Sequence, residues 1–94
     1  MERKLKALVL NCSRDTFKDD KGNIVAYTKT TLGHIAEQSE NFVGYLLEEI
    51  TGKIEDFDVI KSFVGKTVNL DLIYKKVDRK NYRAKIEKIE DITL

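Results

Sequence analysis

The fold of this chain is decided by residues 42–50, which read FVGYLLEEI. Their apolar positions recur at intervals of three and four, the spacing of a helix face. Ser39 stands where a helix would be capped, and Gly52 stands where one would end. As a strand the run alternates poorly, although Val43 and Tyr45 are tolerated there. The local pattern over residues 35–52 therefore favours a helix.

The chain before this stretch predicts two strands joined by a turn. Residues 5–12 are rich in Leu and Val, and we expect a strand in which alternate residues form a buried face. Its members are Leu8, Leu10 and Cys12. Residues 19–23, DDKGN, supply turn formers, with Gly22 free to take a positive φ. The β-branched and aromatic run 24–32, IVAYTKTTL, then favours a second strand.

The chain after this stretch predicts a short helix. Residues 56–64 place apolar side chains on one helical face. These are Phe57, Ile60 and Val64. Asp56 can cap the helix, and Gly65 stands where it would end.

The end of the chain predicts a hairpin. Alternating apolar residues define one strand, and a second alternation follows the turn at residues 78–81. The first set is Val68, Leu70, Leu72 and Tyr74, and the second is Tyr82, Ala84 and Ile86. Ile89 falls out of phase with the second set, which a β-bulge would absorb.

Length and composition predict one domain spanning residues 1–94. The chain is 41% apolar and 35% charged, with a net charge of +1. No apolar run reaches the ~20 residues that span a bilayer. The N-terminus does not resemble a signal peptide. A single cysteine cannot form an internal disulfide, which suits a reducing compartment. We therefore expect a cytoplasmic protein.

Catalytic chemistry has little support in the sequence. Cys12 and His34 are the only residues of their types, which excludes metal sites and catalytic triads built on several of them. The acidic cluster around residues 48–58 lacks the spacing of a calcium loop, and the scattered glycines form no phosphate-binding loop. We expect no enzyme activity, no metal and no cofactor.

The net charge conceals three segments of different sign. Residues 1–36 carry +3, residues 37–58 carry −6, and residues 59–94 carry +4. The most basic stretch, 75–88, has seven cations against two carboxylates and includes tyrosine. Single-stranded nucleic-acid binders combine cations for phosphates with rings that stack on bases.

The expected nucleic-acid contacts follow from that combination. The stacking candidates are Phe17, Tyr27 and Tyr82, and the phosphate candidates are Lys75, Lys76, Arg79, Lys80, Arg83 and Lys85, with Lys18, Lys21 and Lys29 second. Each has a plainer interpretation as core or solvated surface. Tyr74 continues an apolar stripe, so we assign it to the core, whereas Phe17 in an expected polar loop favours a binding role.

The order of elements resembles a known family. The segments FKDDKGNIVAY (17–27), VGKTVNL (64–70) and YRAKI (82–86) resemble the small OB-fold single-stranded DNA-binding, or helix-destabilising, proteins of phages and mobile elements. The resemblance implies an all-β, five-stranded Greek-key barrel with one short helix between the third and fourth strands. Residues 42–50 are then the third strand, because four strands would leave an exposed edge.

The resemblance also implies a function. Ligand contacts would come from the sheet face and from the loops at residues 13–23 and 75–82. We expect sequence-tolerant binding of single-stranded DNA, with RNA as the alternative, by a homodimer in the replication or transfer of a phage or plasmid. A protein-interaction module that uses the acidic segment 37–58 or a free strand edge is the second hypothesis. An α+β domain with a helical middle is the third.

Overall fold

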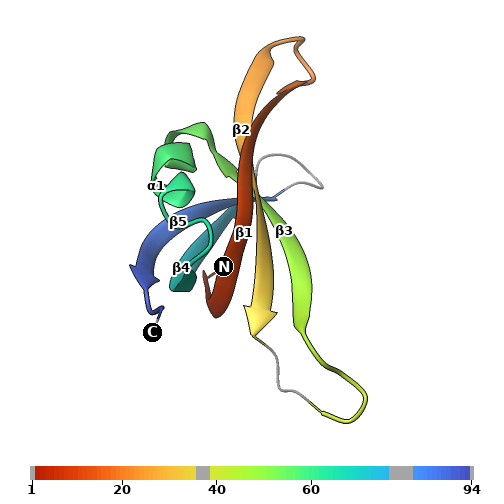
Figure 1. Cartoon of the computed structure of the whole chain (residues 1–94). Coiled ribbons are helices and arrows are strands. Elements are labelled where there is room, and N and C mark those ends of the chain that lie inside the picture. The colour runs from red at the N-terminus through yellow and green to blue at the C-terminus, as the bar shows by residue number, and fades with distance from the viewer. Residues whose placement is uncertain (1, 36–38, 77–81, 94) are drawn as a thin grey trace.

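The computed structural model describes residues 2–35, 39–76 and 82–93. Five strands dominate it: β1 (Glu2–Lys18), β2 (Ile24–Ile35), β3 (Tyr45–Lys53), β4 (Thr67–Lys76) and β5 (Tyr82–Asp91). They close into a barrel in the order β1-β2-β3-β5-β4 (Figure 1). A short 3₁₀ turn, η1 (Ile54–Asp56), and helix α1 (Phe57–Lys61) lie between β3 and β4. The expected five-stranded OB-type barrel is confirmed.

The stretch that decides the fold is a strand. β3 pairs antiparallel with β2 along its whole length, from Tyr45 opposite Ile35 to Lys53 opposite Tyr27. The helix favoured by local spacing, and with it the α+β hypothesis, is wrong because pairing with β2 outweighs local preference. The strand begins three residues later than expected, after a tight turn in which Ser39 and Phe42 form an isolated bridge.

β1 differs from its prediction in phase and in length. The buried residues are Ala7 and Val9, while Leu10 is exposed. Leu5 and Cys12 pack against the core, and a register shift between Val9 and Asn11 changes which positions face inward. The sequence pattern was misleading because both phases of this strand are apolar. Residues 13–18, expected in a loop, continue the strand and pair with β2.

The turn between β1 and β2 forms as predicted. A carboxylate oxygen of Asp19 accepts hydrogen bonds from the backbone N–H groups of Lys21 (3.0 Å) and Asn23 (2.8 Å). Gly22 has a φ of 79°, which a residue with a Cβ adopts only with strain. The two strands therefore extend past the barrel as a hairpin, seen at the top of Figure 1.

The helical segment is shorter than predicted. Ile60 is buried, but Val64 is exposed and Phe63 packs against the core in its place. Asp56 occupies the N-cap position without a side-chain capping hydrogen bond. Gly65 ends the segment with a φ of 86°, as its position in the sequence indicated.

The closing hairpin is confirmed. Val68, Leu70 and Leu72 are buried, and Tyr74 packs against this core as predicted. Asp71 pairs with Lys88 and Leu72 with Ile86, so Glu87 is an extra residue in β5 and supplies the expected bulge. Among the described residues, no helix is long and apolar enough to cross a membrane.

One parallel contact closes the barrel between β3 and β5. Gly52 of β3 pairs with Ala84 of β5, and this is the only register pair between the two strands in the described ranges. The same contact brings the start of β5 beside the paired strands β2 and β3. Residues far apart in the sequence thereby meet at one surface.

A polar network joins four strands of the barrel. The guanidinium of Arg3 donates to both carboxylate oxygens of Glu48, at 2.5 and 2.9 Å, and to the hydroxyl of Tyr74 at 3.2 Å. His34 Nε2 lies 3.3 Å from Glu48 Oε1. The hydrogen bonds from Arg3 hold the pKa of Glu48 below its ordinary value of 4.5, against the opposing effect of burial.

We expect this network to make stability depend on pH. Because the pKa of Glu48 is depressed in the folded state, its contribution is present above pH 4.5 and is lost as pH falls through the folded value. Both side chains are about one-third exposed, so the contribution is about 1 kcal/mol. In urea unfolding at pH 7 and pH 3, Glu48→Gln should lose less stability on acidification than the wild type. Equal losses would contradict the assignment.

Candidate nucleic-acid interface

The outer face of β1 and β2 carries aromatic and basic side chains. Thr28 and Thr30 are buried, so even-numbered positions of β2 face the interior and odd-numbered positions face outward. Tyr27 and Lys29 therefore lie on the outer face. Phe17 of β1, paired with Val25, shares this face. The extended hairpin thus presents a continuous outer surface rather than a flexible loop.

Three predicted contact residues meet on this surface. The rings of Phe17 and Tyr27 lie 5.6 Å apart between centroids, in an edge-to-face arrangement. The guanidinium carbon of Arg83 lies 5.9 Å from the centroid of Phe17. Phe17 is 39% exposed, so part of its ring remains open to solvent. We call Phe17, Tyr27 and Arg83 the ring cluster; it combines two aromatic rings with a planar cation.

Lysines border the ring cluster. Lys53 of β3 pairs in register with Tyr27, which places it on the same outer face. Lys29 lies on this face as predicted, with its ammonium 3.7 Å from the carboxylate of Glu49. Sequence reasoning missed Lys53, because the position lies at the end of an acidic segment and its neighbour across the sheet is fixed only by strand register.

The other predicted cations are distributed around the cluster. Lys18 and Lys21 are exposed at the tip of the β1–β2 hairpin, and Lys75 and Lys76 are exposed at the end of β4. Lys85 lies 3.6 Å from Glu87, an ion pair that reduces its availability to a phosphate. Arg79, Lys80 and the side chain of Tyr82 lie outside the described part of the chain.

On the inner face of the β1–β2 hairpin, two cations contact the ring of Phe57. The guanidinium carbon of Arg14 lies 4.5 Å from the ring centroid of Phe57, and Lys61 Nζ lies 5.7 Å from it. Arg14 pairs with the buried Thr28 and therefore sits on the inner face, toward α1. These contacts hold the hairpin against η1 and α1, and so fix the position of the ring cluster. No pattern in the sequence indicates these contacts.

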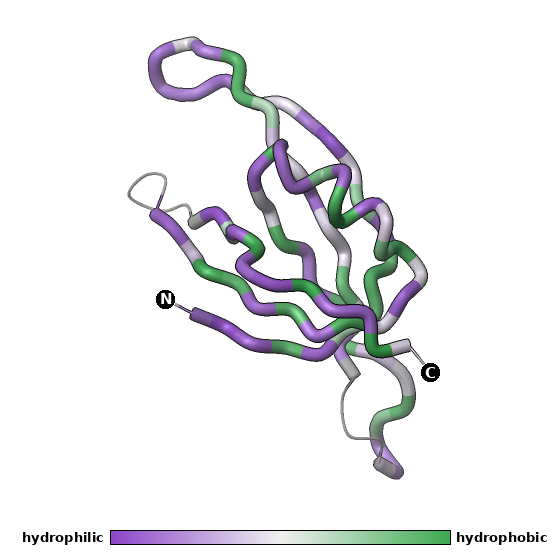
Figure 2. The backbone as a smooth tube through the Cα atoms, turned by 90° about the vertical axis from the view of Figure 1, so that its left-hand side faces the viewer, coloured by the Kyte–Doolittle hydropathy of each residue, from purple (hydrophilic) through white to green (hydrophobic). Residues whose placement is uncertain are grey.

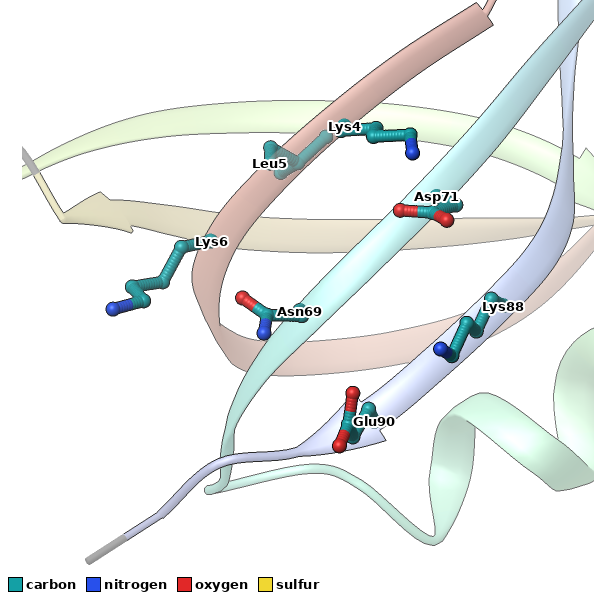
Figure 3. A pocket seen from close by; sticks show the side chains of 7 residues that line it. All are labelled: Lys4, Leu5, Lys6, Asn69, Asp71, Lys88 and Glu90. Atoms are coloured by element: carbon teal, nitrogen blue, oxygen red, sulfur yellow. The ribbon is translucent and has the colours of Figure 1, made fainter.

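The opposite wall of the barrel carries a shallow polar hollow. Its lining side chains come from β1, β4 and β5 (Figure 3): Lys4, Leu5, Lys6, Asn69, Asp71, Lys88 and Glu90. Asp71 pairs in register with both Lys4 and Lys88, so opposite charges lie side by side. Three lysines and two carboxylates attract phosphate less than a purely basic surface would. The ring cluster is the better candidate for a nucleic-acid interface.

The remaining candidate groups serve the fold. Cys12 packs against the core and accepts a hydrogen bond from the hydroxyl of Thr30 at 3.6 Å. His34 and Glu48 belong to the polar network with Arg3 and Tyr74. Within residues 2–35, 39–76 and 82–93, no three His, Cys, Asp or Glu side chains are grouped to hold a metal ion.

Comparison of the sequence with models of known protein families and with curated proteins finds no match in either. The geometry of the ring cluster therefore carries the functional argument.

Proposed function

We propose that this protein binds single-stranded DNA without sequence preference, through base stacking on Phe17 and Tyr27 and phosphate contacts with surrounding cations. The process would be replication or transfer of phage or plasmid DNA in the cytoplasm. Binding would remove secondary structure from the strand and protect it, without catalysis. The homodimer implied by the family resemblance remains a prediction.

The observation that carries the proposal is the ring cluster. Every base has an aromatic face, so exposed rings bind bases of any sequence, at about 1–3 kcal/mol per base. Arg83 adds a planar cation that can contact a phosphate or stack on a base. OB-type barrels bind oligonucleotides on this sheet face and at the loops that border it.

The charge distribution supports the same surface. Two prominent carboxylates of the acidic middle segment have cationic partners within the chain, Glu48 with Arg3 and Glu49 with Lys29. Their pairing reduces the repulsion that an acidic segment would exert on a nucleic acid nearby. The near-zero net charge is therefore compatible with a local basic surface.

A titration of labelled oligo-dT, followed by fluorescence anisotropy at several salt concentrations, tests the proposal. Binding should weaken with rising salt, with a log–log slope of roughly −0.7 per neutralised phosphate. Three to six phosphate contacts correspond to a slope of about −2 to −4. Absence of binding at about 50 mM salt, where electrostatic contacts are strong, would refute the proposal. Parallel titration of oligo-U compares DNA with RNA.

A further inference from the structure

The hairpin formed by β2 and β3 projects from the barrel and carries exposed apolar residues (Figures 1 and 2). In β3, Tyr45, Leu46 and Leu47 are 53%, 54% and 69% exposed. None of the three belongs to the barrel core or to the ring cluster. Large apolar side chains grouped at an exposed surface indicate an interaction site. Their distribution over the two faces of β3 indicates what this surface binds.

Tyr45 lies on the outer face of β3. Ile50 and Gly52 are buried, so even-numbered positions of this strand face inward and odd-numbered positions face outward. Tyr27 of β2 pairs in register with an odd-numbered position of β3, so the outer faces of the two strands are continuous. Tyr45 therefore shares a face with the ring cluster, whereas its neighbour Leu46 lies on the opposite face.

Gly33 of β2 supports the side chain of Tyr45. Gly33 pairs with Leu47, so Tyr45 is its diagonal neighbour across the two strands, within reach of an aromatic side chain. A Cβ on Gly33 would lie 3.4 Å from both Cβ and Cγ of Tyr45 and 3.5 Å from its Cδ1. The tyrosine thus covers the backbone of the glycine, in space that a side chain would otherwise fill. One side of Tyr45 rests on the sheet, and about half of the residue remains exposed to solvent.

We propose that Tyr45 is a second stacking site for the same single strand of DNA, separate from the ring cluster. The inference rests on the proposed function and adds to it a contact within the acidic middle segment of the chain. A tyrosine held against the sheet loses little conformational entropy when a base stacks on it. Such a contact is worth about 1–3 kcal/mol and does not depend on the base. Leu47, beside Tyr45 on the same face, extends the apolar surface.

The carboxylates of β3 do not oppose a strand of DNA on the outer face. Glu48 lies on the inner face, where both of its carboxylate oxygens accept hydrogen bonds from Arg3. Glu49 lies on the outer face with its carboxylate 3.7 Å from the ammonium of Lys29. The hydroxyl of Thr31, an outward position opposite Glu49, can donate to a phosphate. The surface between the two stacking sites is therefore polar without an unpaired carboxylate of β3.

Lys6 supplies a cation near the second site. Ala7 and Val9 are buried, so Lys6 of β1 faces outward, and it is exposed. This part of β1 pairs with β2 around Gly33, which supports Tyr45. The partner of Lys6 on β4 is Asn69, a neutral residue. A phosphate next to a base stacked on Tyr45 therefore has a cation on the same face.

The distance between the two sites suits one oligonucleotide. Tyr27 and Gly33 are six positions apart on β2, about 20 Å at ~3.3 Å per residue. At ~3.4 Å per nucleotide, about six nucleotides cover this distance, and a more extended strand needs fewer. OB-type barrels occupy about 4–16 nucleotides each. The outer face of β2 and β3 is therefore the path that joins the ring cluster to Tyr45.

Tryptophan fluorescence tests the second site directly, because the chain contains no tryptophan. Tyr45→Trp keeps an aromatic ring at the site, and its fluorescence should be quenched as oligo-dT of about 15 nucleotides stacks on it. Tyr27→Trp is the matched reporter in the ring cluster and should also be quenched. Quenching of Tyr27→Trp alone would overturn the second site and leave DNA binding standing. If neither variant is quenched and anisotropy detects no binding by the wild type, the proposed function fails as well.

Affinity measurements separate stacking from general apolar contact. Tyr45→Ala should weaken binding of the same oligo-dT by about 5-fold or more, the lower limit for one stacked base, whereas Tyr45→Phe should retain wild-type affinity. Leu46→Ala is the matched control, because Leu46 is the next residue, is equally exposed and lies on the opposite face. It should bind within about 2-fold of the wild type, since it offers no ring to a base. Wild-type affinity in Tyr45→Ala, with an unchanged circular dichroism spectrum, would overturn the proposal.

Discussion

Replacing Phe17 and Tyr27 together by alanine is expected to weaken oligo-dT binding by about 30-fold or more. Each stacked base is worth about 1–3 kcal/mol, and the lower limit for two rings, about 2 kcal/mol, corresponds to that factor. The two rings contact each other at 5.6 Å, so each single variant should also lose part of the support given to the other ring. Anisotropy titration at fixed salt measures the effect.

The matched control for this variant is Ile24→Ala. Ile24 is 70% exposed and pairs with Lys18 near the tip of the same hairpin, but it lies on the face opposite to the ring cluster. Its removal should leave affinity within about 2-fold of the wild type, because it supplies no ring for stacking. Circular dichroism should show an unchanged sheet in all variants. Wild-type affinity in the folded double variant would exclude stacking on these rings.

The turn chemistry and the closing hairpin could be predicted from the sequence because their signals are local. Asp19 and Gly22 each act within four residues along the chain, and both behave as predicted. The alternation of Val68, Leu70 and Leu72 has one apolar phase only, so it identified the buried face correctly. In β1 both phases are apolar, and a bulge changes the inward positions, so alternation could not identify the face.

The third strand could not be predicted from the residues of its own segment alone. Residues 42–50 have helical spacing, and pairing of residues 45–53 with β2 overrides it. The exposed apolar residues of this segment explain the ambiguity, since Leu46 and Leu47 lie on opposite faces of β3 and neither enters the core. Spacing indicates a helix when apolar residues are assumed to be buried. That assumption fails here.

The candidate site was predicted as a set of residues but not as an arrangement. The sequence predicts a loop at Phe17, but Phe17 lies on a strand, where pairing with Val25 fixes its orientation. Its contact with Arg83 joins β1 to β5, and no pattern within either segment indicates it. The contact depends on closure of the barrel between β3 and β5. At that closure Gly52 of β3 pairs with Ala84 of β5.

Replacing Gly52 by valine is expected to lower the free energy of unfolding by about 2–3 kcal/mol, the usual effect of overpacking a tight site. A Cβ at this position would lie 3.0 Å from the backbone oxygen of Ala84 and 3.0 Å from the hydroxyl oxygen of Thr28. Neither atom can retreat easily, because one belongs to the backbone of the closing strand and the other to a buried side chain. Valine adds two further carbon atoms at the same place.

Gly33→Val is the matched control, because it makes the same substitution on β2, against a neighbour that can move. A Cβ there would meet the Cβ of Tyr45 at 3.4 Å, an ordinary contact with a half-exposed side chain. Urea unfolding should therefore show a clear loss for Gly52→Val and at most about 1 kcal/mol for Gly33→Val. Gly52→Val should also weaken oligo-dT binding, because displaced β5 would carry Arg83 away from Phe17. Equal stability of the two variants would show that β3 and β5 can separate without cost to the barrel.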